Sequence, residues 1–193
     1  MKNMITLTDQ QLITLFNDGE ANAMEILVNR HKDRIYTSIY LLVKDKYLAE
    51  DIFQDLFIKI IETFRAGKYK EENKFAQWAM RIGHNLCVDH FRKVKSKPTI
   101  RTSDGADIFD VLNFAEPGAD DKIMKTQSSE RIMKMVCKLP EDQREIIILR
   151  HFADLKFREI SNLLDCSVNT ALGRMRYALG NLRKMIEEKQ IAL

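Results

Sequence analysis

The chain has 193 residues, of which 45% are hydrophobic and 31% are charged, so it can bury one large core or two small ones. Its formal net charge of +3 is too small to identify a nucleic-acid partner by itself. The N-terminus lacks the apolar run of a signal peptide, and no apolar stretch is long enough to span a bilayer. Three scattered cysteines offer no disulfide framework and indicate a reducing compartment. The sequence predicts a cytoplasmic protein without direct membrane insertion.

The hydrophobic pattern predicts an all-α protein. Gly and Pro are few, strand-like alternation is almost absent, and long segments rich in Leu, Ile, Lys and Glu show helical periodicity. Thr8 and Gln11 have the spacing of a capping box, which predicts a short helix ending near Asp18-Gly19. Asn22 with Glu25 repeats this signal and predicts a longer helix that runs to about Val43.

The segment LAEDIFQDLFIKIIETF (residues 48–64) predicts an amphipathic helix with an acidic face. Its expected core stripe consists of Ile52, Phe53, Leu56, Ile60 and Phe64. The remaining surface carries Asp51, Gln54, Asp55 and Glu62. For a generic helix this is a solvated face. The alternative is a ridge that docks on a basic partner, where charge complementarity sets orientation and association rate.

Residues 65–73 (RAGKYKEEN) predict a loop, and Lys74–Val94 predicts a helix that mixes aromatic and basic residues. The aromatic and apolar positions are Phe75, Trp78, Ile82, Leu86 and Phe91, and the polar ones include Arg81, His84, Asn85, Arg92 and Lys93. Such a mixture suits single-stranded nucleic acid, because rings stack on bases while cations follow the backbone. Burial of Trp78 and Phe91 in a core is the competing interpretation.

A metal site on this helix is a further alternative, since His84, Cys87 and His90 recur at three-residue spacing. It needs additional ligands from elsewhere, and no Cys-x-x-Cys accompanies the three residues. A metal-dependent hydrolase could be assembled from these histidines and nearby carboxylates, but no spacing or glycine loop supports it. The sequence therefore predicts no metal, no cofactor and no catalytic residue.

The chain is expected to divide into two domains at an acidic linker. Lys97–Lys125 holds six Asp and Glu residues against four Lys and Arg, together with Pro and Gly and no sustained helical period. The predicted boundaries are an N-terminal helical domain at residues 1–95, a flexible linker at 96–126 and a C-terminal domain at 127–193.

The C-terminal domain is expected to contain a helix-turn-helix. The periodic segments Phe157–Leu164 and Val168–Met185 are separated only by Asp165-Cys166-Ser167, which suits a sharp crossing of two helices. Asp165 tolerates the left-handed conformation that the turn needs, and Ser167 is expected to be the N-cap of the second helix.

The second of these helices is expected to bury one stripe and to present a polar, basic face. The predicted buried stripe is Val168, Ala171, Met175, Leu179, Leu182 and Met185. The opposite face carries Asn169, Thr170, Gly173, Arg176, Tyr177, Asn181, Arg183 and Lys184. Amide and guanidinium groups can pair with base edges and phosphates. A solvated face on an ordinary helical bundle is the alternative, because two-helix turns also occur in proteins that do not bind DNA.

Both halves of the chain resemble the extracytoplasmic-function (group 4) sigma factors of bacterial RNA polymerase. LAEDIFQDLFIKI, KFAQWAMRIGHNLCVDHFRK, LPEDQREIIILRHFADLKFREISNLL and SVNTALGRMRYALGNLR occur in the order found in that family. The resemblance covers about residues 24–95 and 128–184 and omits the linker. It implies a protein without enzymatic activity that binds core RNA polymerase and promoter DNA, commonly under the control of an anti-sigma factor.

The resemblance also implies roles for particular residues. Asp51, Gln54 and Asp55 resemble the surface that docks on the polymerase. The loop at residues 65–73 and the helix bearing Phe75, Trp78, Arg81 and Asn85 resemble the part that reads and holds the melted downstream promoter element. For the upstream duplex element the main candidates are Arg176 and Tyr177, followed by Asn169, Thr170 and Arg174, with Arg150 as a phosphate contact.

Two positions on the recognition helix depart from the family pattern. Leu172 and Gly173 stand where family members often have a basic residue and a Ser, so Leu172 can offer only apolar contact, for example to a thymine methyl group. The alternative function is a stand-alone helix-turn-helix transcriptional regulator, which leaves the features of the first half unexplained. A pure protein-interaction module leaves the basic face unexplained.

Overall fold

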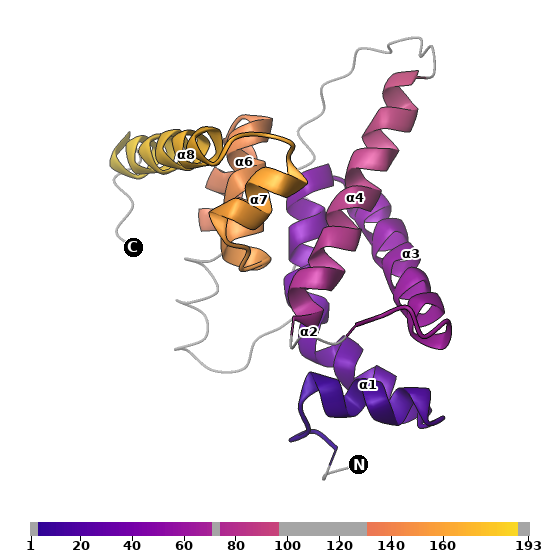
Figure 1. The fold of residues 1–193 in the computed structure, drawn as a ribbon. Helices are drawn as coiled ribbons and strands as arrows, with labels where there is room; N and C mark the ends of the chain where they lie inside the picture. Colours follow the sequence, from indigo (N-terminus) through magenta and orange to yellow (C-terminus); the bar gives the residue numbers. More distant parts are fainter. Residues whose placement is uncertain (1–3, 71–73, 97–130, 189–193) are drawn as a thin grey trace.

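The computed structural model describes residues 4–70, 74–96 and 131–188, and their regular elements are all helices. This confirms the predicted all-α class. The N-terminal part consists of α1 (Asp9–Asn17), α2 (Ala21–Val43), α3 (Lys46–Arg65) and α4 (Phe75–Ser96). Figure 1 shows α1 packed across one end of α2, with α3 and α4 alongside α2. Most of the predicted linker lies outside the described residues.

Local capping explains where two of these helices, α1 and α3, begin. The predicted capping box is present, since Thr8 Oγ1 accepts from the Gln11 backbone N–H at 3.3 Å and Gln11 Oε1 accepts from that of Thr8 at 2.9 Å. At α3, Asp45 accepts from the Leu48 N–H at 2.9 Å. The predicted signal at Asn22 is not used, because α2 already begins at Ala21 after an uncapped Glu20.

The core of the N-terminal part follows the predicted stripe of α3. Ile52, Leu56, Ile60 and Phe64 are buried, while Phe53 is half-buried. Rings from three segments meet around Phe64, which lies near the end of α3. They come from α1, from the loop after α3 and from the start of α4, where Phe75 is only 1% exposed. Aromatic packing therefore fixes the connection between α3 and α4.

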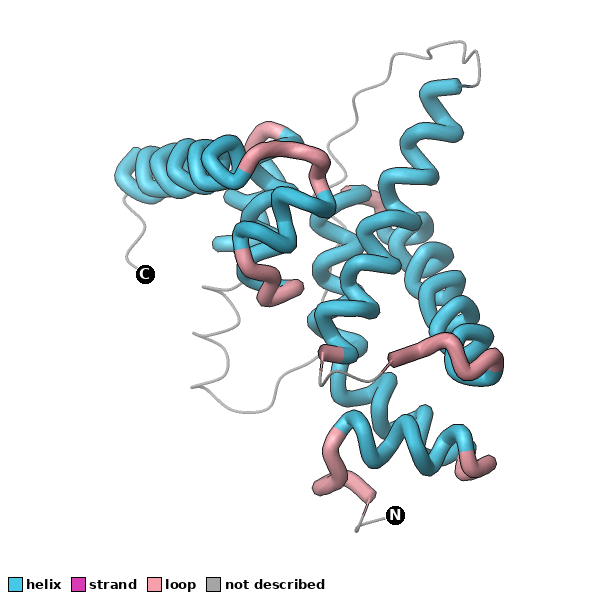
Figure 2. Tube along the Cα trace, in the orientation of Figure 1, coloured by secondary structure: helices cyan, strands magenta, loops and turns pink. Residues whose placement is uncertain are grey.

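The C-terminal part is a second helical unit. Residues 131–138 are helical and are followed by α6 (Glu141–Ile147), a π-helical turn η2 (Ile148–Phe152), α7 (Phe157–Leu163) and α8 (Val168–Glu188). Short loops join these helices (Figure 2). Helix α8 packs against both α6 and α7 and extends away from the N-terminal part in Figure 1.

The two parts share one continuous hydrophobic core, which the two-domain prediction did not anticipate. Helix α2 contacts η2 and α6 as well as its own neighbours. Ile35 and Ile39 of α2 and Met80 of α4 face Ile148 and Leu149 of η2 around the same small apolar space. The C-terminal unit is thus packed directly on α2 and α4.

A polar cluster attaches α1 to α2. Asp9 lies 2.6 Å from Arg30 Nη1 and 2.8 Å from His31 Nε2, and Arg30 also donates to the backbone carbonyls of Ile5 and Leu7. Partial burial of the Asp9 carboxyl acts to raise its pKa, but the hydrogen bonds and charges of His31 and Arg30 outweigh this effect. The net result is a pKa below its ordinary value of 3.8.

We expect Asp9→Asn to lower the free energy of unfolding at neutral pH by about 1–2 kcal/mol, because it removes a charge-assisted pair. A lowered folded-state pKa means that the stabilisation is complete above the ordinary Asp pKa and is lost as the pH falls through the lower folded value. Urea unfolding at several pH values should therefore show the two proteins converging in acid. The exposed Asp33→Asn is the matched control. A difference in the free energy of unfolding that stays constant down to the lowest pH at which both proteins fold would contradict this account.

Candidate nucleic-acid interface

The turn between α7 and α8 has the predicted local chemistry. Asp165 adopts a left-handed φ of 47°, and Ser167 Oγ accepts from the backbone N–H of Thr170 at 3.0 Å. At the start of α7, Glu159 Oε2 accepts from the backbone N–H of Lys156 at 2.9 Å. Side-chain caps thus define the start of both helices of the helix-turn-helix.

The buried stripe of α8 differs in part from the predicted one. Ala171 and Met175 are buried as predicted, and Ala178 is buried as well. Val168 and Leu179 were predicted to be buried but are 40% and 49% exposed. The two fully buried alanines have small side chains, which permit close approach of α8 to α6 and α7. Val168 and Leu179 therefore lie at the edge of this contact and remain in solvent.

The outward face of α8 contains most of the predicted upstream-element residues. Exposed side chains on it are Asn169, Thr170, Leu172, Arg176 and Tyr177. Tyr177 is 70% exposed. At Gly173 no described heavy atom lies within 4 Å of the position that a Cβ would take, so another molecule can approach the backbone there. This face offers amide, guanidinium and phenol groups to a partner.

Three polar residues near this face have partners within the protein. Arg174 Nε lies 3.7 Å from Asp142, and Asn181 donates to Gln143 Oε1 at 2.7 Å. Arg150 donates to the Leu155 carbonyl at 3.1 Å, and its guanidinium also lies near a carboxylate and over an aromatic ring. Asn181, placed on the outward face by its spacing, therefore joins α8 to α6 instead.

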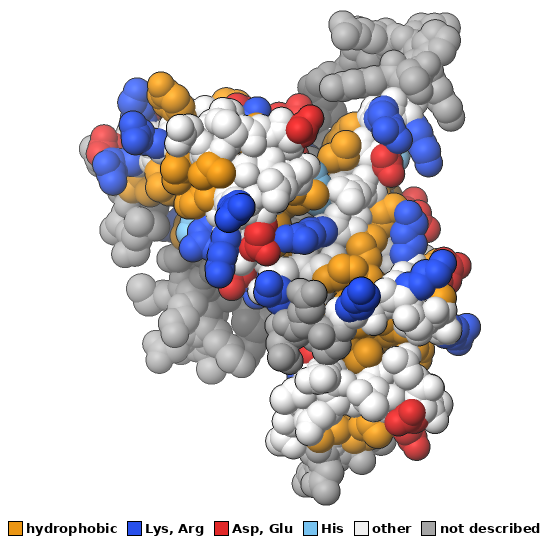
Figure 3. Space-filling model, in the orientation of Figure 1, with side chains coloured by type: hydrophobic (Ala, Val, Ile, Leu, Met, Phe, Trp, Pro, Cys, Tyr) orange, Lys and Arg blue, Asp and Glu red, His pale blue; other side chains and the backbone are white. Residues whose placement is uncertain are grey.

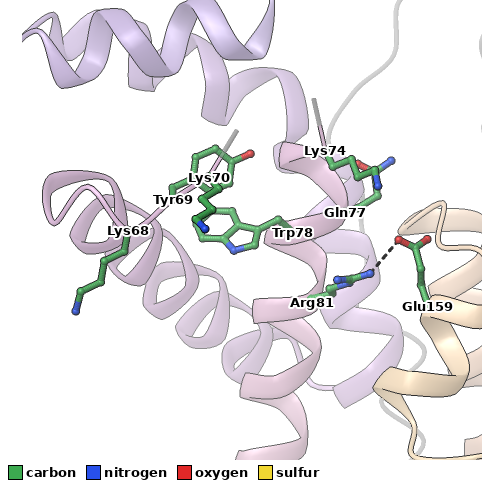
Figure 4. A pocket seen from close by; sticks show the side chains of 8 residues that line it. All are labelled: Lys68, Tyr69, Lys70, Lys74, Gln77, Trp78, Arg81 and Glu159. Carbon is green, nitrogen blue, oxygen red and sulfur yellow. Dashed lines mark hydrogen bonds and ion pairs between the residues drawn. The ribbon is translucent and has the colours of Figure 1, made fainter. Parts of the chain in front are cut away.

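The second candidate surface is a pocket of about 380 Å³ beside Trp78 (Figure 4). Trp78 stacks on Phe64, with ring centroids 5.9 Å apart and an interplanar angle of 13°, and it lies 4.5 Å from the Tyr69 ring. The pocket is lined by Lys68, Tyr69, Lys70, Lys74, Gln77, Trp78, Arg81 and Glu159. Figure 3 shows Lys and Arg side chains gathered on the face where the C-terminal unit meets α4. An aromatic platform surrounded by cations can hold a nucleobase and its phosphates.

The predicted residues of the α4 surface do not all meet at this pocket. Trp78 and Arg81 line it, but the Phe75 ring is buried beneath them and supports Trp78 without reaching the surface. Asn85 is exposed in a separate groove between α3 and α4. The resemblance already indicated the loop that carries Lys68 and Lys70, but sequence reasoning named neither these lysines nor Lys74 and Gln77. The alternation of Lys and Tyr in the loop at 68–70 was a signal that could have identified part of this set.

The acidic ridge of α3 is exposed as an uninterrupted face. Asp51, Gln54 and Asp55 all point to solvent. Tyr47 and Ile58, at compatible helical spacing, flank them and are 79% and 54% exposed. Two large apolar side chains thus bracket the carboxylates, which is a composition suited to a protein partner.

In the group of His84, Cys87 and His90, the first histidine has a partner on α6. His84 is 5% exposed, and its Nε2 lies 2.7 Å from Glu145 Oε1 of α6. Burial raises the pKa of the Cys87 thiol to about 12, which disfavours the thiolate that a metal requires. Within residues 4–70, 74–96 and 131–188, no three His, Cys, Asp or Glu side chains are grouped so as to hold a metal ion.

The fold is all-helical and contains a helix-turn-helix, and the α8 face and the Trp78 pocket have the composition of nucleic-acid interfaces. Residues 27–97 match the family Sigma-70 region 2, and residues 129–178 match Sigma-70, region 4. Together the two matches cover more than half of the chain, and they place it in the sigma-70 family of RNA polymerase sigma factors. Its similarity to ECF sigma factors of several bacteria places it in the ECF group. None of the described helices is long and apolar enough to cross a membrane.

Relatives in several bacteria match over most of their length. The ECF RNA polymerase sigma factor SigW of Bacillus subtilis is 27% identical over 177 residues, covering 88% of this chain and 92% of SigW. The ECF RNA polymerase sigma-E factor of Escherichia coli K12 is 28% identical over 177 residues, covering 88% and 89%.

The fold is shared with a solved structure of the sigma factor RpoE from Bartonella quintana in complex with the anti-sigma factor NepR. That comparison has a TM-score of 0.62 at 18% identity and covers 85% of this chain and 96% of that one. CnrH in complex with the cytosolic domain of CnrY has a TM-score of 0.59 at 20% identity, covering 93% and 97%.

We expect Asn181→Ala to destabilise the protein by about 1 kcal/mol, because it removes the hydrogen bond that joins α8 to α6. Arg176→Ala, on the exposed face of the same helix, should change stability by less than about 0.5 kcal/mol. Chemical unfolding of the two variants beside the unmodified protein measures both values. Equal losses of stability would show that Asn181 has no structural role beyond that of an exposed residue.

Proposed function

We propose that this sigma factor recognises promoters with two separate surfaces, the outward face of α8 for the upstream duplex element and the Trp78 pocket for the melted downstream strand. The observation that carries the proposal is the presence of both surfaces on one chain. A stand-alone helix-turn-helix regulator has no use for a lysine-lined aromatic pocket or for the bracketed acidic ridge of α3.

Duplex recognition would use α8 in the major groove. Arg176 can form a bidentate pair with guanine, and each contact of this kind contributes about 1–3 kcal/mol of discrimination. Tyr177, Asn169 and Thr170 are exposed on the same face and would contact base edges or phosphates. Leu172 would supply an apolar contact. Arg174 and Arg150 could reach phosphates only by exchanging their present intramolecular partners.

Strand capture would use the pocket beside Trp78. A base taken out of the duplex stack can lie against the indole, while lysines of the loop and of α4 neutralise the adjacent phosphates. Stacking contributes about 1–3 kcal/mol per base, which offsets a similar cost of unpairing. Asn85 would act from its neighbouring groove, and Phe75 would act only as support for Trp78.

The ridge on α3 would bind core RNA polymerase. Asp51 and Asp55 supply charge for orientation, and Tyr47 and Ile58 supply apolar area at either end. Bond formation would belong to the polymerase, because the proposed role requires no catalytic group, metal or cofactor of this chain. The structural relatives bound to anti-sigma factor NepR and to CnrY support an anti-sigma partner here as well.

Run-off transcription with purified core polymerase on genomic promoter fragments tests the proposal. Initiation at discrete sites only in the presence of this protein supports it and reveals the promoter sequence. Tight binding to duplex DNA without polymerase, together with no affinity for core polymerase, would favour the stand-alone regulator.

Asp55→Lys should lower the affinity for core polymerase at least tenfold, because it places a cation within the acidic ridge. The control is Glu25→Lys, which makes the same charge change on an exposed position of α2. Fluorescence anisotropy with labelled protein measures both affinities, and circular dichroism checks the fold. If the two variants bind core polymerase equally well, the ridge is not the docking surface.

Arg176→Ala should reduce transcription about fivefold or more from promoters that depend on the upstream element, since a lost guanine contact amounts to about 1–3 kcal/mol. Arg183→Ala removes the same charge further along α8 and serves as the control for non-specific attraction. Transcription is then measured on promoters in which each upstream base is varied in turn. Arg176→Ala should lose base preference at one position, whereas Arg183→Ala should keep its base preference at every position. An unchanged preference profile would remove Arg176 from direct base recognition.

A further inference from the structure

The pocket beside Trp78 has one acidic lining residue, and that residue comes from the other half of the molecule. Lys68, Lys70, Lys74 and Arg81 belong to the N-terminal part, whereas Glu159 belongs to α7 of the helix-turn-helix. Figure 4 shows Glu159 reaching across to Arg81 at the pocket edge.

The contact between Arg81 and Glu159 is well defined. Arg81 Nη2 donates to Glu159 Oε1 at 3.1 Å, and the two side chains are 42% and 27% exposed. The other carboxylate oxygen, Oε2, accepts from the backbone N–H of Lys156 at the start of α7. The helix cap therefore holds the carboxylate in a fixed orientation, with one oxygen available to the guanidinium.

A second pair supports the same interface from the adjacent turn of α4. His84, three residues after Arg81, lies with its Nε2 2.7 Å from Glu145 Oε1 of α6, and the imidazole is almost completely buried. Ile148 and Leu149 of η2 pack beneath these polar contacts against α2 and α4. Two glutamates of the C-terminal unit thus lie against two basic residues along one side of α4.

A carboxylate and a phosphate compete for the same guanidinium. The carboxylate is planar and the phosphate is tetrahedral, but each presents a pair of oxygens that accepts two N–H donors of arginine. We propose that Glu159 acts as an internal mimic of the DNA phosphate on Arg81. In the free protein this contact, together with the His84–Glu145 pair, latches the helix-turn-helix unit over the Trp78 pocket and weakens binding of single-stranded DNA. Separation of the two halves exposes Arg81. The inference deepens the proposed role of the pocket and rests on it for the identity of the ligand.

The test is the double variant Glu145→Gln/Glu159→Gln. Glutamine keeps the acceptor that caps α7 but removes both negative charges from the interface. The control, Glu25→Gln/Glu187→Gln, removes the same charge from two exposed positions. One measurement is the distance between spin labels at Asp33→Cys in α2 and Arg183→Cys in α8, in a Cys166→Ser background. The other is the affinity for a fluorescent 15-nucleotide oligothymidine.

We expect a narrow distance distribution in the latched protein and in the control, and a broad one in the double variant. The affinity of the double variant for oligothymidine should rise about fivefold or more, and that of Glu159→Gln alone about two- to fivefold, as suits a half-exposed ion pair. Identical distance distributions in all proteins would overturn the latch.

Two further outcomes separate the parts of the proposal. A broad distance distribution in the double variant, with no higher affinity for oligothymidine than the control has, would overturn the phosphate mimicry while supporting the latch. If none of the proteins binds oligothymidine but the distance distribution of the double variant is still broad, the proposed DNA role of the pocket fails and the latch is supported.

Discussion

Burial of α2 is the constraint on which the rest of the molecule depends. This helix contacts α1, α3 and α4 on the N-terminal side and α6 and η2 on the C-terminal side, with Ile35 and Ile39 about 1% exposed at the centre. Because apolar area on several sides of one helix must be covered at once, α3 and α4 can present only their outer faces to solvent. Those outer faces carry the acidic ridge and the Trp78 pocket. The surfaces of α3 and α4 that we assign to partners are therefore the faces that do not pack against α2.

Charge segregation matters more for this protein than its net charge. A formal charge of +3 conceals an exposed acidic face on α3, a lysine-lined pocket beside Trp78 and a basic face on α8. Opposite potentials on separate elements can orient one molecule between an enzyme and its DNA template without a single strongly charged region. The apolar flanks of the ridge, Tyr47 and Ile58, add area that charge alone would not supply.

The sequence predicted those features that are set within a few residues of the chain. The left-handed Asp165, the cap at Ser167 and the box at Thr8 depend on local hydrogen bonds, so their residue types are sufficient signals. Burial on α8 was predicted less well, because 3.6-residue periodicity cannot tell whether Leu179 or Ala178 faces the neighbouring helices. Phe75 and Trp78 are equally aromatic in the sequence, and only the packing of α3, α4 and their connecting loop determines which ring reaches the pocket.

The contact between the halves was beyond sequence reasoning, since Arg81 and Glu159 are separated by 78 positions and each looks like an ordinary surface charge. Its consequence follows from linkage. If the halves bind each other with the same Arg81 that binds the melted strand, every partner that draws α7 away from α4 strengthens strand binding, and strand binding favours separation by an equal free energy. The polymerase docking that we propose for α3 and the duplex binding that we propose for α8 would both act in this way without contacting the pocket. Coupling between the surfaces would then arise from competition for one guanidinium and requires no change within either helical unit.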